Sequence, residues 1–203
     1  MFRNRILSVI ALSLSIAFAQ QAPAQSPVVP QYNGNNLLFP DGLRTWVFVG
    51  SNIGLAYKEE LRQMALRVAK QADKPLFHNI YINPEAYAHF RDTGEFPDPT
   101  IFVMDMFASA TKEPQHVVTK GSYDGAWMGN LVAVKNSARP PGPNGEKTIW
   151  AYYIFTDDPA HPTQPVASAP AQADAACETC HKAHGLKDNV WVQFYPTLRD
   201  LKK

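Results

Sequence analysis

The chain has 203 residues, of which 45% are hydrophobic and 18% are charged, and its formal net charge is +1. A sequence this close to neutrality, with no block of Lys and Arg, is not typical of a nucleic-acid-binding surface, because neutralising phosphates takes clustered basic residues. Its length is typical of one domain with a substantial hydrophobic core.

The N-terminus predicts a secretory signal peptide over residues 1–19. Arg3 and Arg5 precede an apolar stretch at residues 6–18, which is shorter than the roughly 20 residues that a membrane-spanning helix needs. An uncleaved membrane anchor is the alternative. Residues 20–36 begin with a stretch rich in Pro, Ala and Gln and predict a flexible leader. We therefore expect a periplasmic or otherwise exported protein that is soluble after signal cleavage.

The next elements along the chain are five predicted strands. Each is a run of β-branched and aromatic residues bounded by Gly, Pro or Asn, as is typical of strands. The runs are residues 44–50, 77–83, 100–108, 127–136 and 148–156. Together they predict one antiparallel sheet.

Helical patterns lie between these strands. Apolar residues at helical spacing predict a helix over residues 58–72. A second predicted helix begins at Pro84, a residue favoured at the first helical position, and ends at Gly94.

The C-terminal part predicts a linker followed by more helix. Residues 157–174 are rich in Pro and Ala and read as a linker, and a helical segment is expected from about residue 175. The expected fold class is α+β: a single domain over residues 37–203, mainly antiparallel β-sheet with peripheral helices.

The only two cysteines, Cys177 and Cys180, belong to a C-x-x-C-H sequence that ends at His181. A disulfide is chemically allowed in an exported protein, but the βαβ pattern that normally surrounds a redox C-x-x-C is missing. Together with His184 these residues are too close in sequence to surround a zinc ion with good tetrahedral geometry. On a helix, both sulfurs face one way and can form thioethers to the vinyl groups of a haem, while His181 turns toward the iron. The motif therefore predicts one haem c per chain, on a C-terminal haem-attachment helix.

The second axial position of the predicted haem iron is the next question. Electron-transfer cytochromes commonly use a Met there, and no Met follows His181 in this chain. The upstream candidates are Met64, Met104, Met106, Met128, His78 and His89. The late position of the motif favours an iron with one protein ligand and an open site. The four-helix cytochromes c′ share that late motif, but this chain is too rich in strands to be one.

Several blocks of sequence resemble, in order, the cytochrome P-460 family, which includes the cytochrome c′-beta branch. The blocks are WVFVG at 46–50, FHNIYINPEAYAHFRDTGEFPDPT at 77–100, VAVKNSAR at 132–139, WAYYIF at 150–155 and CETCHKAHGLKDNVWVQFYPTLR at 177–199. The resemblance implies a largely antiparallel sheet with a haem c, a proximal histidine matching His181, an open distal site and, in many members, a homodimer.

The resemblance also identifies a distal pocket. The cross-linking lysine of the hydroxylamine-oxidising members is replaced by Met104, their proton-transferring acid falls on Leu131, and an arginine of some members is replaced by His78. The expected pocket residues are His78, Phe102, Met104, Leu131 and Ala133. His78 is left open between a distal hydrogen-bond donor, a sixth ligand and a solvent-facing residue, and the four apolar residues also fit plain sheet core.

Three functions remain in competition. An apolar pocket favours small neutral diatomics, so the first is binding of nitric oxide or a related gas, for sensing, scavenging or detoxification. The second is an oxidoreductase acting on hydroxylamine or another reactive nitrogen species, which needs a base that this pocket lacks. The third is an electron-transfer cytochrome, with a redox partner that the sequence does not identify.

Overall fold

The computed structural model describes residues 27–55, 58, 74–112, 117, 119–158 and 161–201. The predicted signal peptide, residues 1–19, lies outside the described residues, as does the predicted helix over 58–72 apart from its first residue. Within the described parts of the chain, no helix is both long and apolar enough to cross a membrane.

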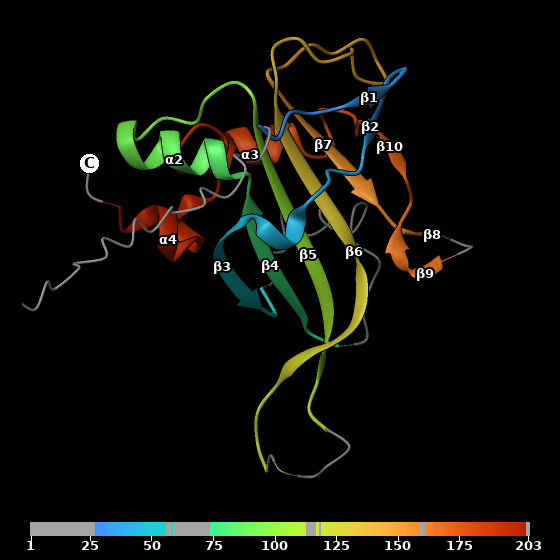
Figure 1. Cartoon of the computed structure of the whole chain (residues 1–203), viewed down its shortest axis with the longest axis vertical. Helices are drawn as coiled ribbons and strands as arrows, with labels where there is room; N and C mark the ends of the chain where they lie inside the picture. Colours follow the sequence, from blue (N-terminus) through green and yellow to red (C-terminus); the bar gives the residue numbers. More distant parts are fainter. Residues whose placement is uncertain are drawn as a thin grey trace, which may run out of the picture.

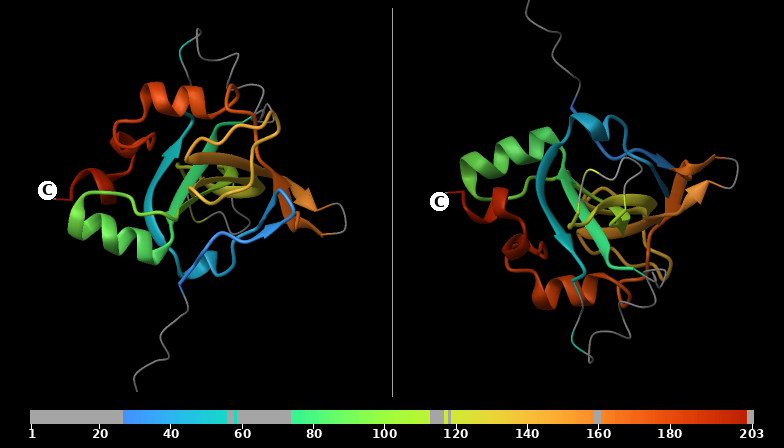
Figure 2. Two further views of the ribbon diagram at one scale, coloured as in Figure 1. Left: turned by 90° about the horizontal axis from the view of Figure 1, so that it is seen from above. Right: turned by 90° about the horizontal axis from the view of Figure 1, so that it is seen from below.

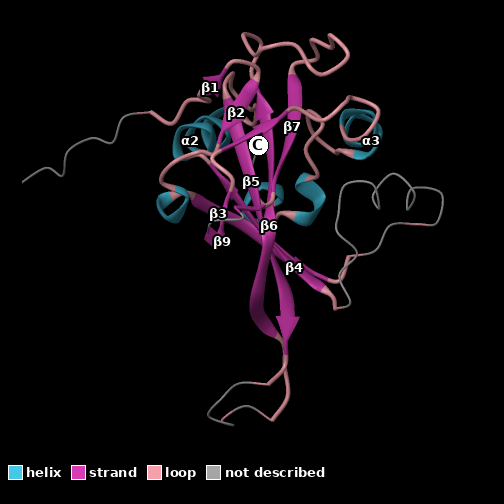
Figure 3. Cartoon of the chain, turned by 90° about the vertical axis from the view of Figure 1, so that its right-hand side faces the viewer, coloured by secondary structure: helices cyan, strands magenta, loops and turns pink. Residues whose placement is uncertain are grey.

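The fold is built on one antiparallel sheet of five strands (Figure 1). The strands are β3 (Val47–Ile53), β4 (Leu76–Ile82), β5 (Thr100–Ala110), β6 (Tyr123–Lys135) and β7 (Trp150–Phe155). They lie in chain order, so each strand pairs with its neighbour in sequence. This confirms the predicted sheet and the α+β class, with one local difference: the first predicted strand begins as the 3-10 helix η1 (Leu43–Thr45). Beyond the sheet, β5 and β6 continue as a long hairpin (Figure 3).

Side-chain alternation gives the sheet two different faces, which we call the helix face and the strand face. The register pairs Phe102 with Ala133 and Met104 with Leu131, so these four side chains share the helix face. Their sequence neighbours point the other way and fill the strand face, among them Val103 at 0% exposure. Both faces are packed against other elements, which fixes the register strongly, because a slip by one residue would move every side chain to the opposite face.

The helices cover the helix face, on one side of the sheet (Figure 2). They are α2 (Pro84–Thr93), α3 (Glu178–His184), the 3-10 helix η2 (Val192–Phe194) and α4 (Pro196–Arg199). The predicted helix from Pro84 to Gly94 and the helical C-terminal segment are thus confirmed. The C-terminal segment lies so close to β3 that a Cβ added at Gly50 would be 2.9 Å from Cδ of Pro196. This close approach covers the edge strand of the sheet.

The Asn-Pro-Glu sequence at 83–85 ties the start of α2 to the sheet. Asn83 is 1% exposed, and its Oδ1 accepts a hydrogen bond from the backbone N–H of Ile101 on β5, at 2.9 Å. Its amide donates to Glu85 at 3.2 Å. Pro84 has no N–H to satisfy at the first helical position. This family-like block therefore has a structural role.

Two small sheets lie against the strand face, on the opposite side from the helices (Figure 2). One contains β1 (Tyr32–Asn33), β2 (Asn36–Leu38) and β10 (Ser168–Pro170), and the other contains β8 (Asp157–Asp158) and β9 (His161–Pro165). Two expectations are corrected here: the range 157–174, expected to be a linker, contains the strands β8, β9 and β10, and the range 20–36, expected to be a flexible leader, contains β1 and the first residue of β2.

The reason for both errors is a pairing between distant segments. Leu37 is opposite Ala169 in the register of β2 and β10, and the two side chains are 0% and 1% exposed. Each segment is poor in strand-forming residues, so neither predicts a strand alone. Burial against the strand face and mutual hydrogen bonding together outweigh local propensity.

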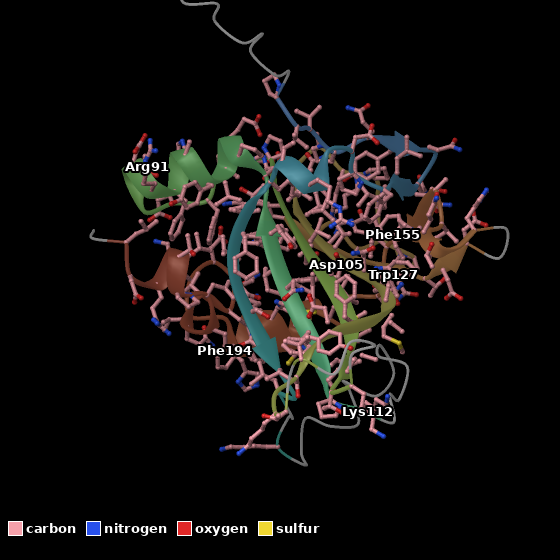
Figure 4. All side chains as sticks on the ribbon, turned by 60° about the horizontal axis from the view of Figure 1, so that its bottom comes forward. Arg91, Asp105, Lys112, Trp127, Phe155 and Phe194 are labelled. Atoms are coloured by element: carbon pink, nitrogen blue, oxygen red, sulfur yellow. The ribbon has the colours of Figure 1, made fainter. Side chains whose placement is uncertain are left out.

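The strand face also holds a polar cluster around Asp105 (Figure 4). Trp127 Nε1 and Asn130 Nδ2 both donate to Oδ1 of Asp105, at 2.8 and 3.0 Å. Nearby, Asn79 donates to Asp124 at 2.8 Å. Burial raises the pKa of Asp105, because the desolvation of its carboxylate outweighs the two hydrogen bonds, which lower the pKa.

We expect Asp105→Asn to flatten the pH dependence of stability. Because its pKa is raised, folded Asp105 still holds a proton that the unfolded chain has released. The free energy of unfolding of the wild type therefore falls as the pH rises from the ordinary pKa of 3.8 to the raised folded value. Asparagine keeps an oxygen that both donors can reach and has no charge, so the variant lacks this fall. Denaturant unfolding of the full-length proteins at several pH values measures it.

Trp127→Phe is the matched variant for this measurement. It removes the N–H that donates to Asp105, so the pKa of Asp105 rises further and the fall in stability extends to higher pH. The same pH slope in the wild type and both variants would contradict the prediction.

Candidate haem site

The two cysteines lie at the start of α3. Cys177 occupies the N-cap position and is 8% exposed, and Cys180 follows one helical turn later with intermediate exposure. Both cysteines are free thiols in the structure, and no disulfide joins them. Burial raises the pKa of the Cys177 thiol to about 11. The thiol is therefore protonated at neutral pH, and it lies in the apolar core of the helix face.

His181 is packed between aromatic rings and held by one hydrogen bond. Its ring centroid is 4.4 Å from that of Tyr152 and 5.7 Å from that of Trp191. Nδ1 lies 3.0 Å from the carbonyl oxygen of Asn189. A carbonyl only accepts, so Nδ1 must carry the proton, which leaves the lone pair on Nε2. Burial lowers the pKa of His181, although the hydrogen bond to Asn189 opposes this. The ring is thus the neutral tautomer that metal ions bind.

The tight turn at 188–189 is tied to the sheet. Both residues have left-handed backbone conformations, with φ of 47° at Asp188 and 62° at Asn189, which Asp and Asn tolerate better than most residues. Asp188 Oδ2 accepts from Lys135 Nζ at 2.7 Å, and Oδ1 accepts from Trp150 Nε1 at 3.3 Å. Lys135 and Trp150 face one another across β6 and β7. The sheet therefore positions the turn whose carbonyl holds His181.

An apolar patch on the helix face lies beside this assembly. We define it by four partly exposed side chains of the central and neighbouring strands: Met104, Leu131, Ala133 and Ile154. Tyr152, whose ring contacts that of His181, is the cross-strand partner of Ala133. Partial exposure in the middle of a sheet is unusual where the other face of the same strands is fully buried, and indicates room for a further apolar group.

The residues present fit a haem. Two thiols one helical turn apart, a neutral imidazole with its Nε2 lone pair free, and an adjacent apolar patch provide the donor set and the surroundings that this group needs. The zinc alternative has no such support. Within residues 27–55, 58, 74–112, 117, 119–158 and 161–201, no three His, Cys, Asp or Glu side chains are grouped so that they could hold a metal ion.

The expected pocket residues differ in their surroundings. Met104, Leu131 and Ala133 lie together in the patch. Phe102, at 6% exposure, is packed among rings, with that of Phe96 at 5.4 Å and that of Trp150 at 6.3 Å. This is the environment of a core residue, so a role for Phe102 at the iron stays a prediction.

His78 also lies on the helix face. It is nearer the β5–β6 hairpin than the patch is, and it is opposite Met106 in the register of β4 and β5. Burial lowers the pKa of His78, so its ring is neutral at neutral pH. Its possible roles as hydrogen-bond donor or sixth ligand stay predictions. His184, by contrast, is exposed.

Sequence reasoning missed four residues of the site: Tyr152, Ile154, Glu178 and Asn189. Ile154 could have been found, because it alternates with Tyr152 along β7. The Asp188-Asn189 pair is a signal for a left-handed turn. Nothing in the sequence pattern indicates that the Asn189 carbonyl reaches His181, because this contact depends on the folded turn.

Lys135→Met tests how firmly the sheet holds the turn. The pair of Lys135 and Asp188 is mostly buried, with side-chain exposures of 15% and 27%. Removing the cation leaves the carboxylate without its ion-pair partner, so we expect the free energy of unfolding to fall by roughly 1–3 kcal/mol. Denaturant unfolding of the full-length protein measures this loss.

Lys187→Met is the control. Its partner Glu95 is 65% exposed, and such surface pairs contribute about 0–1 kcal/mol. A loss in Lys135→Met no larger than that in Lys187→Met would contradict the prediction.

Two comparisons with known proteins bear on this site. The family model described as Cytochrome P460 matches residues 40–192, which is most of the chain and includes both cysteines and His181. A search of curated proteins finds no match. The site geometry and the extent of the family match agree, and the chain belongs to the cytochrome P460 family of haem-binding cytochromes.

Proposed function

We propose that this protein is an exported haem c protein that binds nitric oxide, or a related small neutral gas, at an open iron position. The observation that carries the proposal is the ring of His181, whose Nδ1 donates to the Asn189 carbonyl and so leaves the Nε2 lone pair for a metal, in the short helix that also begins with the two free cysteines. Sensing, scavenging and detoxification would all use such binding, and the proposal covers these three roles.

Cys177, Cys180 and His181 would hold the cofactor. Each thiol would add across one vinyl group of the haem, forming a carbon–sulfur bond while the thiol hydrogen goes to the vinyl carbon. His181 would provide the axial nitrogen to the iron. When bound, the haem supplies an iron with a vacant coordination position for a diatomic ligand.

The apolar patch favours a neutral ligand. Met, Leu, Ala and Ile side chains offer an entering molecule no charge and no strong hydrogen bond, so anions and water gain little there. Nitric oxide and carbon monoxide lose little hydration on entering such a site. The patch residues also provide no base, and hydroxylamine oxidation must remove protons as well as electrons. These properties favour gas binding over that reaction.

Export is part of the proposal. The expected signal peptide over residues 1–19 and the C-x-x-C-H motif agree, because covalent haem attachment of this kind takes place after export to the periplasm. The predicted homodimer and the redox partner also remain proposals.

Replacing both cysteines tests covalent attachment. We expect wild-type protein, matured in a periplasm with haem-attachment machinery, to carry one haem that stays with the chain through denaturing electrophoresis and adds its mass to the intact protein. Cys177→Ala/Cys180→Ala should lose the haem under denaturing conditions. Wild-type protein whose haem is released by denaturation would contradict haem c.

Absorption spectra with and without nitric oxide test the open site. We expect a high-spin spectrum that shifts when nitric oxide is added, and a loss of this spectrum in His181→Ala. His184→Ala is the matched control, because this exposed histidine on the same helix should have no effect. His78→Ala should also leave the spectrum nearly unchanged.

Two results would overturn the gas-binding proposal. A low-spin spectrum that is indifferent to nitric oxide, and that loses its low-spin character in His78→Ala, would identify an electron carrier with His78 as sixth ligand. Steady turnover of hydroxylamine with an electron acceptor would identify an oxidoreductase.

A further inference from the structure

Glu178 is a buried carboxyl group inside the C-x-x-C-H motif. It follows Cys177 directly and is 6% exposed. Burial raises the pKa of Glu178, and the hydrogen bond from Tyr152 opposes this shift. A buried carboxyl group is costly unless donors satisfy its oxygens, and Glu178 has one for each. Tyr152 donates to Oε2 at 3.1 Å, and Asn189 Nδ2 donates to Oε1 at 2.7 Å.

Asn189 connects this carboxyl group to His181. Its side chain donates to Glu178, while its backbone oxygen accepts from Nδ1 of His181 at 3.0 Å. The two contacts are made by one residue with a left-handed φ of 62°. The contact with Glu178 therefore restrains the same residue whose carbonyl orients the imidazole.

We propose that Glu178 and Asn189 are positioning residues for the axial histidine, which set the orientation of the His181 ring and its strength as an electron donor to iron. This inference rests on the proposed function, since it takes His181 as the axial ligand. A firm hydrogen bond at Nδ1 makes Nε2 a stronger donor, which strengthens the iron–histidine bond and favours the ferric state. Glu178 and Asn189 reach the iron only through His181.

The arrangement is more specific than the packing of α3 requires. An apolar residue at 178 would fill the same buried position without the cost of desolvating a carboxyl group. The carboxyl group is instead matched to two donors from different elements, Tyr152 of β7 and Asn189 of the turn. It thus fixes the turn relative to both the sheet and the haem-attachment helix.

Asn189→Gly is the decisive variant. Glycine accepts the left-handed backbone without strain and keeps the carbonyl, so only the link to Glu178 is removed. In the haem-loaded protein we expect a lower iron–histidine stretching frequency by resonance Raman in the ferrous state. We also expect roughly a tenfold shift toward ferrous iron at a fixed potential, equal to about 59 mV for a one-electron couple. Glu178→Gln should shift both quantities in the same direction.

Tyr152→Phe is the matched control. It also removes one hydrogen bond to Glu178 but keeps the ring against His181 and leaves the Asn189 link intact, so its effect on the stretching frequency should be small. If Glu178→Gln fails to fold, Asn189→Gly still decides the question.

The outcomes separate this inference from the proposed function. If Asn189→Gly carries haem and binds nitric oxide but has the stretching frequency and potential of the wild type, Glu178 is only a structural residue and the inference is wrong. If His181→Ala leaves the wild-type spectrum unchanged, the proposed axial ligand itself is wrong, and the inference falls with it.

Discussion

The pairing register of β5 and β6 is the constraint on which the rest of the site depends. It places Met104 opposite Leu131 and Phe102 opposite Ala133, all on the helix face. The alternate residues, among them Val132 at 1% exposure, are packed on the strand face. A one-residue slip would bury the wrong set on both faces at once, so the cost of the slip is shared by the whole core. The helices pack on the helix face, and α3 thereby places the two cysteines and His181 on that side of the sheet.

Close approach of the backbone completes the site on the helix side. Gly185 ends α3 with an ordinary backbone φ of −66°, so conformational freedom does not explain why glycine is needed there. Space does: an added Cβ would lie 2.5 Å from the carbonyl carbon of Asn189 and 2.7 Å from the oxygen of His181. A side chain at 185 would push the turn away from the helix, and the Asn189 carbonyl would no longer reach the imidazole.

The sequence predicted what depends on local pattern. Runs of β-branched and aromatic residues bounded by Gly, Pro or Asn were sufficient for all five strands of the main sheet, and Pro84 and Gly94 marked the ends of α2 closely. The pairing of β2 with β10 was missed, because neither segment has strand propensity and their contact joins distant parts of the chain. In the site, the motif identified the cysteines and His181 by type and spacing. Glu178 and Asn189 were missed, because the contacts of the Glu178 carboxyl group and of the Asn189 carbonyl form only when the turn is folded.

The polar groups of α3 and of the turn at 188–189 are engaged in hydrogen bonds, whereas the patch residues are apolar. Asp188 is bound by Lys135 and Trp150, and Glu178 by Tyr152 and the Asn189 amide. The Asn189 carbonyl is taken by His181. A ligand that takes one of these donors must break a buried hydrogen bond, which costs about 1–3 kcal/mol. Under the proposed function, these engaged donors add to the discrimination against anions that the apolar patch provides.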